Sequence, residues 1–74
     1  MIELRFHKEL YDGAAVDQAQ KTYGAFAELS LSEESVCWVV QVVHADPARE
    51  RRVASELSNF ALGVTIERKN GARG

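Results

Sequence analysis

The feature that most constrains the fold is a nearly continuous apolar run over residues 36–44. Five of these nine residues are valine, and Cys37 and Trp38 add two more apolar side chains. β-Branched residues favour extended backbone, and a strand without alternation is typical of one that is covered on both faces. We therefore predict a central strand here, with further strands on both of its sides.

Two other segments predict half-buried strands. A strand is predicted over residues 2–10, where Ile2, Leu4 and Phe6 alternate with polar residues, and another over residues 27–31, where Leu29 and Leu31 do the same. Such alternation places one face of a strand against a core and the other in water. The polar residues 32–35 then form a hairpin loop of ordinary length, which joins the second strand to the apolar third strand.

Two helices are expected between and after these strands. Asp12 is a good N-cap for a helix over residues 13–24 or a little beyond, whose apolar positions recur at helical spacing through Phe26. Asp46 and Pro47 start a second helix strongly, because aspartate caps free N–H groups and proline suits the first helical position.

The end of the second helix is open at the level of sequence. Gly63 either ends the helix, so that residues 64–68 form a fourth strand, or lies inside a longer helix at a cost of about 1 kcal/mol. The two readings are close to even, with a slight preference for the longer helix. We take residues 1–68 as a single domain and residues 69–74 as a flexible tail.

The order of elements is therefore β-α-β-β-α, an α+β domain, with the fourth strand left open. A crossover from the first strand to the second, with the third strand inserted between them, is the split βαβ layout. This layout puts the apolar third strand in the middle of the sheet and both helices on one of its faces.

An apolar stripe is then expected on the face without helices. We assign the Trp38 side of the third strand to the core, so the side formed by Cys37, Val39, Gln41 and Val43 faces outward. Apolar patches of this kind commonly mark a contact with another chain, although monomers also tolerate a half-exposed valine stripe.

No residues converge on a recognisable catalytic or metal-binding set. The two histidines, His7 and His44, lie far apart in sequence, and Cys37 is the only cysteine. A metal site needs three or four converging ligands, and a nucleophile needs a base beside it. We expect no cofactor and no metal, and an enzyme that uses Cys37 or His7 is a remote alternative.

Composition limits the classes of partner and the cellular location that we expect. The formal net charge is −2, which argues against a nucleic-acid binder, because binding phosphates requires clustered lysine and arginine. Arg49, Arg51 and Arg52 are the best basic patch for an acidic partner. The single cysteine excludes an internal disulfide, and with no apolar stretch long enough for a membrane and no signal-peptide pattern we expect a reducing, cytoplasmic location.

The chain resembles the HxsD family of His-Xaa-Ser peptide-maturation systems over roughly residues 5–68. The residues that carry the resemblance are Leu10-Tyr11, Ala14-Ala15-Val16, Ala19, Tyr23, and residues 56–62 of the last helix. The resemblance implies a small accessory protein that acts beside a radical-SAM enzyme and a repeat-containing peptide. On the last helix, Glu56 and Asn59 are the positions to test.

The function expected from the sequence is that of a non-enzymatic accessory or adaptor protein. Such a domain would bind a protein or peptide partner through its open sheet face or through a free sheet edge, to which an extended peptide can add as a strand. The alternative is a structural homodimer without a separate ligand. A chain of 74 residues can bury only a small core, so either kind of association would also stabilise it.

Overall fold

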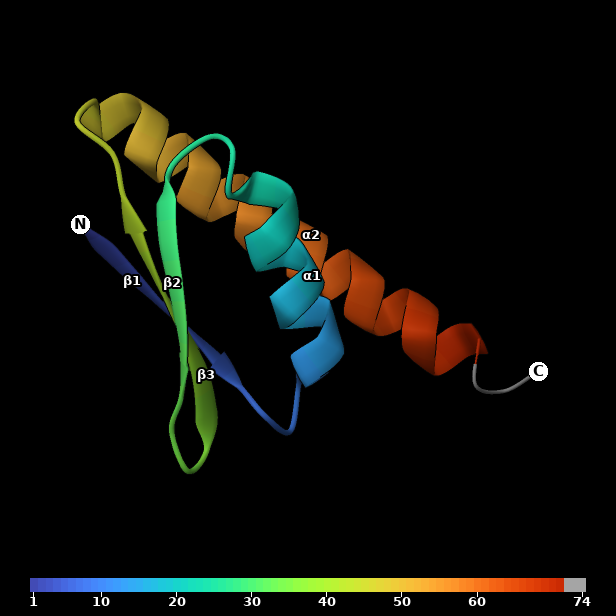
Figure 1. The fold of residues 1–74 in the computed structure, drawn as a ribbon. Helices are drawn as coiled ribbons and strands as arrows, with labels where there is room; N and C mark the ends of the chain where they lie inside the picture. Colours follow the sequence, from blue (N-terminus) through green and yellow to red (C-terminus); the bar gives the residue numbers. More distant parts are fainter. Residues whose placement is uncertain (72–74) are drawn as a thin grey trace.

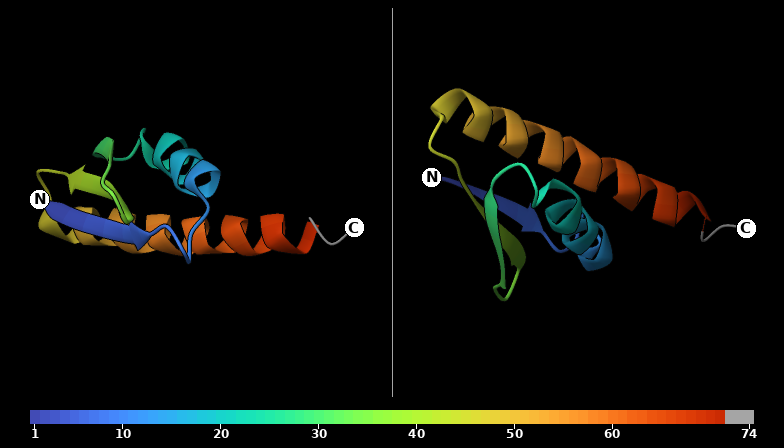
Figure 2. Two further views of the ribbon diagram at one scale, coloured as in Figure 1. Left: turned by 90° about the horizontal axis from the view of Figure 1, so that it is seen from below. Right: turned by 45° about the horizontal axis from the view of Figure 1, so that its top comes forward.

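The computed structural model describes residues 1–71 and has two layers, a sheet and a pair of helices (Figure 1). The elements along the chain are β1 (Ile2–His7), α1 (Gly13–Tyr23), β2 (Glu28–Glu33), β3 (Cys37–Val43) and α2 (Pro47–Gly71). Both helices lie on the same side of the sheet, as the views in Figures 1 and 2 agree. The predicted α+β fold and its β-α-β-β-α order are confirmed.

The sheet has the strand order β1-β3-β2, and both outer strands run antiparallel to β3. Leu4 of β1 and Leu31 of β2 both face Val40 of β3 across the sheet. The apolar strand is therefore central, and β1 and β2 are parallel to each other on its two sides. This is the split βαβ layout that the sequence predicted.

The core lies between β3 and the two helices. Val40 and Val42 are fully buried there, and Trp38 packs against them at the margin, which confirms that the Trp38 side of β3 faces the helices. The buried residues of this core come from four of the five elements: Phe6, Val16, Ala19, Val40, Val42, Val53, Ala54, Leu57 and Ala61.

Both helix starts follow their predicted capping residues. Asp12 Oδ1 accepts a hydrogen bond from the Ala14 N–H at 3.0 Å, and Asp46 Oδ1 accepts one from the Ala48 N–H at 3.0 Å. Each aspartate thus satisfies a backbone donor that has no partner within its helix. Pro47 occupies the first position of α2, where its missing N–H costs nothing.

The second helix passes through Gly63 without a break, so residues 64–68 are helical and form no fourth strand. Contacts of the following turns with Asp12 offset the cost of the glycine. The Thr65 hydroxyl accepts from the Asp12 N–H at 3.3 Å, and Arg68 Nε donates to Asp12 Oδ2 at 2.6 Å. This Arg68 contact, with the Ala14 N–H, lowers the pKa of the Asp12 carboxyl.

Several boundaries differ from the sequence-based expectation. β1 ends at His7 because the N–H groups of Leu10 and Tyr11 both donate to the His7 carbonyl and turn the chain. β2 extends to Glu33, which tightens the hairpin. The tail was expected from residue 69, whereas α2 reaches Gly71; positions 72–74 lie outside the described residues.

Two glycines make a matched test of the packing. A Cβ added at Gly13 would lie 2.5 Å from Trp38 Cζ2, whereas one added at Gly63 would meet nothing within 4 Å. We expect Gly13→Ala to destabilise the fold by about 1–3 kcal/mol through overpacking. Gly63→Ala should stabilise it by about 0.5–1 kcal/mol through helix propensity. Urea denaturation of both variants measures this, and equal effects would contradict the close Gly13–Trp38 packing.

A pH dependence follows from Glu50. Its carboxylate is nearly buried, accepts from the His44 N–H at 3.1 Å and lies 3.1 Å from the Met1 ammonium. These contacts, the His44 hydrogen bond first, lower the pKa of Glu50 below its ordinary value of 4.5. The ionised form therefore stabilises the fold above the ordinary pKa, and this stabilisation disappears as the pH falls through the lowered one.

Glu50→Gln is expected to be less stable than the unmodified chain at neutral pH and to lose less stability on acidification. Denaturant unfolding at a series of pH values from neutral to strongly acidic measures how the free energy of unfolding changes with pH in the variant and in the unmodified chain. Glu67→Gln, on an exposed part of the same helix, is the control and should keep the original profile. Parallel profiles for Glu50→Gln and the unmodified chain would contradict the role of this carboxylate.

Candidate functional site

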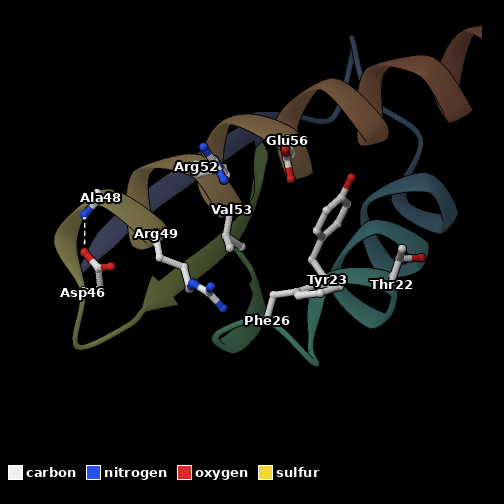
Figure 3. Close-up of a pocket in the computed structure, with 9 residues that line it drawn as sticks. All are labelled: Thr22, Tyr23, Phe26, Asp46, Ala48, Arg49, Arg52, Val53 and Glu56. Carbon is white, nitrogen blue, oxygen red and sulfur yellow. Dashed lines mark hydrogen bonds between the residues drawn. The ribbon is translucent and has the colours of Figure 1, made fainter.

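The best candidate site is an open groove between the end of α1 and the first turns of α2 (Figure 3). Its volume is about 750 Å³, within the range typical of ligand sites. The residues around it combine aromatic, cationic and acidic side chains: Thr22, Tyr23, Phe26, Asp46, Ala48, Arg49, Arg52, Val53 and Glu56.

The aromatic side of the groove is built where α1 ends. Tyr23 is the last residue of α1, and its ring packs edge-on against Phe60 with the centroids 5.8 Å apart. The Phe26 N–H donates to the Tyr23 carbonyl, and this turn carries Phe26 out of the helix. Phe26 is therefore 52% exposed and contacts Tyr23 at 6.1 Å between centroids.

The placement of Phe26 corrects the sequence-based expectation, which put it on the buried stripe of the first helix. Helical spacing continues past Tyr23 in the sequence, but the helix does not, because Gly24 follows as its C-cap. An aromatic ring that is half in water, beside a groove, is a more informative feature than one more core residue.

The cationic side of the groove comes from α2. Arg49 and Arg52 lie three residues apart on this helix, so their side chains project from neighbouring turns on one side. Both are exposed, and no ion pair within residues 1–71 engages either of them. Figure 3 shows the Arg49 side chain reaching from α2 toward Phe26.

Two carboxylates also line the groove, but they differ in their roles. Asp46 is engaged as the N-cap of α2 through its bond to the Ala48 N–H. Glu56 lies one turn beyond Arg52, on the side of the groove toward which the Tyr23 hydroxyl points (Figure 3). The unpaired positive charge therefore gathers at the Arg49 end, and hydrogen-bonding groups gather at the Glu56 end.

The structure brings together some of the residues that the sequence singled out and separates others. Arg49, Arg52 and Glu56 meet in the groove with Tyr23 and Phe26. Arg51 and Asn59 are exposed on α2 but are not among the residues that line the groove. The sequence signal for the basic patch was the Arg-rich first turns of α2; nothing in the sequence placed the aromatic residues opposite it.

The outward face of β3 carries the four residues predicted for a partner surface. Cys37 and Gln41 are half-buried, Val43 is 39% exposed, and Val39 is only 3% exposed.

The cover of Val39 comes from the neighbouring strands. Arg5 and Ser32 flank Val39 across the sheet. The Arg5 guanidinium is held in this region by ion pairs with Glu3 and Glu34, and these contacts raise its pKa. The long stem of an arginine can cover apolar surface while its charge stays in water. The apolar stripe is thus interrupted at its centre rather than continuous.

His7 and Cys37 lie directly opposite each other on the outward face, a proximity that sequence spacing did not show. No hydrogen bond joins the two side chains within the described part of the chain. His7 Nδ1 accepts from the Glu9 N–H, so the backbone occupies this ring nitrogen, where a nucleophile–base–acid arrangement would have a carboxylate. His44 Nδ1 is likewise bonded to a backbone N–H, that of Asp46.

Within residues 1–71, no group of three or more His, Cys, Asp and Glu residues could hold a metal ion. No helix of this part of the chain is both long and apolar enough to cross a membrane.

The class of molecule that the fold and groove define is a small α+β domain with an open, mixed-charge groove. Comparisons with models of protein families, with curated proteins and with solved structures find no match for this chain.

The exposed phenylalanine gives a direct test of the site's geometry. Phe26→Ala should change the free energy of unfolding by less than about 1 kcal/mol, because the ring is half in water. Phe6→Ala, at a position that is 3% exposed, is the matched control and should cost about 3–5 kcal/mol. Chemical denaturation of both variants decides, and a Phe26 effect as large as that of Phe6 would mean that Phe26 belongs to the core.

Proposed function

We propose that this domain is a non-catalytic adaptor that binds a short segment of a peptide or protein partner in the groove between α1 and α2. The observation that carries the proposal is the pairing of an exposed aromatic ring, Phe26, with two arginines that have no ion-pair partner in the described chain. Exposed aromatic and arginine side chains are the residue types that dominate binding energy at protein interfaces.

The groove specifies the chemistry of its ligand. Arg49 and Arg52 present guanidinium groups that suit a carboxylate, which accepts paired hydrogen bonds from such donors. Phe26 and Tyr23 offer an apolar surface a short distance away, and Val53 lies between the two sides (Figure 3). A peptide with an acidic residue next to an aromatic or aliphatic one matches both features.

The arrangement of charges also fixes an orientation for the ligand. Its carboxylate belongs at the Arg49 end, because Arg49 and Arg52 are exposed and have no ion-pair partner in the described chain. Hydrogen-bond donors of the peptide, such as backbone N–H groups or hydroxyls, belong at the Glu56 end. Because the groove is open, a linear segment can enter and leave it without any movement of the fold.

The resemblance to the HxsD family supplies a biological context for this adaptor. In that context the domain would act beside a radical-SAM enzyme, with the enzyme or its repeat-containing peptide substrate as the partner. The presence of genes for such an enzyme and such a peptide next to the gene for this chain tests the context. Their absence would leave the groove as a peptide site in another pathway and would overturn the family assignment.

The binding experiment uses peptides of about ten residues that place aspartate or glutamate beside phenylalanine or leucine. Titrated into isotope-labelled protein, they should shift the amide signals of residues 22–26 and 46–56. Arg49→Ala and Arg52→Ala should each weaken binding by about tenfold, the loss of one charge-assisted contact. Arg51→Ala, which removes the same charge outside the groove, is the control and should bind as the unmodified chain does.

Salt and peptide composition separate the two halves of the site. Raised ionic strength should weaken the exposed guanidinium–carboxylate contacts, and a peptide with asparagine in place of aspartate should bind at least tenfold more weakly at low salt. If Arg51→Ala and Arg49→Ala lose the same peptide affinity, the peptide is attracted by overall charge and not bound in the groove. No shift at any peptide concentration would overturn the groove as a peptide site.

A further inference from the structure

The outer edge of β1 is unpaired, and its hydrogen-bonding pattern is known. Among residues 1–71 no strand lies beyond β1 in the sheet. The Lys8 N–H donates to the Val36 carbonyl at 2.9 Å, which fixes the phase of the ladder between β1 and β3. In an antiparallel ladder the backbone groups of alternate residues point to opposite sides. Those of Glu3, Arg5 and His7 therefore point outward, away from β3.

This edge carries the charged side chains of Glu3 and Arg5 but lacks other devices that prevent pairing with another strand. β1 has no proline, no bulge relative to β3, and no lysine between Ile2 and His7. Ile2 and Leu4, on the core side of the sheet, are only half-buried, because nothing flanks them on the outer side. A strand added here would satisfy the outward backbone groups and complete the cover of both side chains.

We propose that this edge pairs with the same edge of a second copy of the chain, antiparallel and about a two-fold axis at Leu4. In this register Glu3 of one copy faces Arg5 of the other, and Arg5 faces Glu3, on the outward face of a joined sheet. On the core side Ile2 faces Phe6 and Leu4 faces its own counterpart. Opposite charges and apolar pairs directly across a sheet both stabilise the pairing.

Charge selects this register among the alternatives. A shift of two residues in one direction places Arg5 opposite Arg5, and a shift in the other direction places Glu3 opposite Glu3. A shift of one residue would set the outward backbone groups of one strand against inward-pointing groups of the other. Only the register centred on Leu4 therefore combines complete backbone pairing with alternating charges.

The other free edge is a poorer match for a second copy. β2 carries Glu28 and Glu33 and no basic residue, so pairing of β2 with itself gains no contact between opposite charges. Pairing of β1 with β2 of another copy is heterologous and would continue into an open chain of molecules. The β1 edge alone gives a closed, symmetric pair with complementary charges.

The association should be weak, because the facing residues from Ile2 to Phe6 bury less surface than a standard interface. It is independent of the groove, which lies between α1 and α2, so either proposal can fail without the other. Sedimentation velocity over about a hundredfold range of protein concentration should show a monomer–dimer equilibrium. Over the same range the Glu3, Arg5 and His7 amides should become protected from hydrogen exchange.

A charge exchange tests the register. Glu3→Arg places two arginines on the edge and Arg5→Glu places two glutamates there, so each variant alone should dimerise at least tenfold more weakly. When the two variants are mixed, every arginine faces a glutamate, and a heterodimer should form at least tenfold more tightly than either variant pairs with itself. Circular dichroism confirms that each variant is folded before it is mixed.

The results of these experiments either support or overturn the pairing of two copies through β1. Recovery of dimer on mixing supports the β1 register. An unmodified chain that stays monomeric up to millimolar concentration overturns the proposal, as do single variants that dimerise normally. Protection of the β1 amides that requires an added peptide, and not a higher concentration of the chain itself, assigns the edge to a peptide partner and also overturns the pairing with a second copy.

Discussion

The arrangement depends on one constraint: β3 is apolar on both faces and can be stable only with cover on both. The helices supply it on one side, where Val40 and Val42 are fully buried. On the other side residues 1–71 form no second layer, yet Val39 is 3% exposed, with Arg5 and Ser32 opposite it on the neighbouring strands. Ion pairs with Glu3 and Glu34 hold Arg5 on this face, where its long stem can cover apolar surface.

Much of the fold could be predicted because its signals are local. Asp12 and Asp46 mark both helix starts through short-range capping, and the alternation in β1 reports directly on a half-buried strand. The position of β3 follows from its composition alone, since a non-alternating valine strand needs neighbours on both sides. Each of these inferences rests on residues that are close in the sequence and in space.

The site could not be predicted to the same extent. It depends on where a helix stops and on contacts between residues that are far apart in the sequence. The exposure of Phe26 follows from where α1 stops, a matter of one turn of helix. Its position opposite Arg49 and Arg52 follows from how two helices cross. After Gly63, α2 makes contacts with Asp12, more than fifty residues away, which no local pattern reports. The burial of Val39 likewise needs three strands and the hairpin turn together.

The link between Asp12 and the last turns of α2 has a consequence for the order in which the fold forms. The Asp12 N–H and carboxylate find partners in Thr65 and Arg68, so residues more than fifty positions away complete the turn that opens α1. Contacts between residues so far apart in the sequence form slowly, because a long loop must close before they are made. The turn before α1 is therefore expected to reach its native hydrogen bonding late, after α2 has docked.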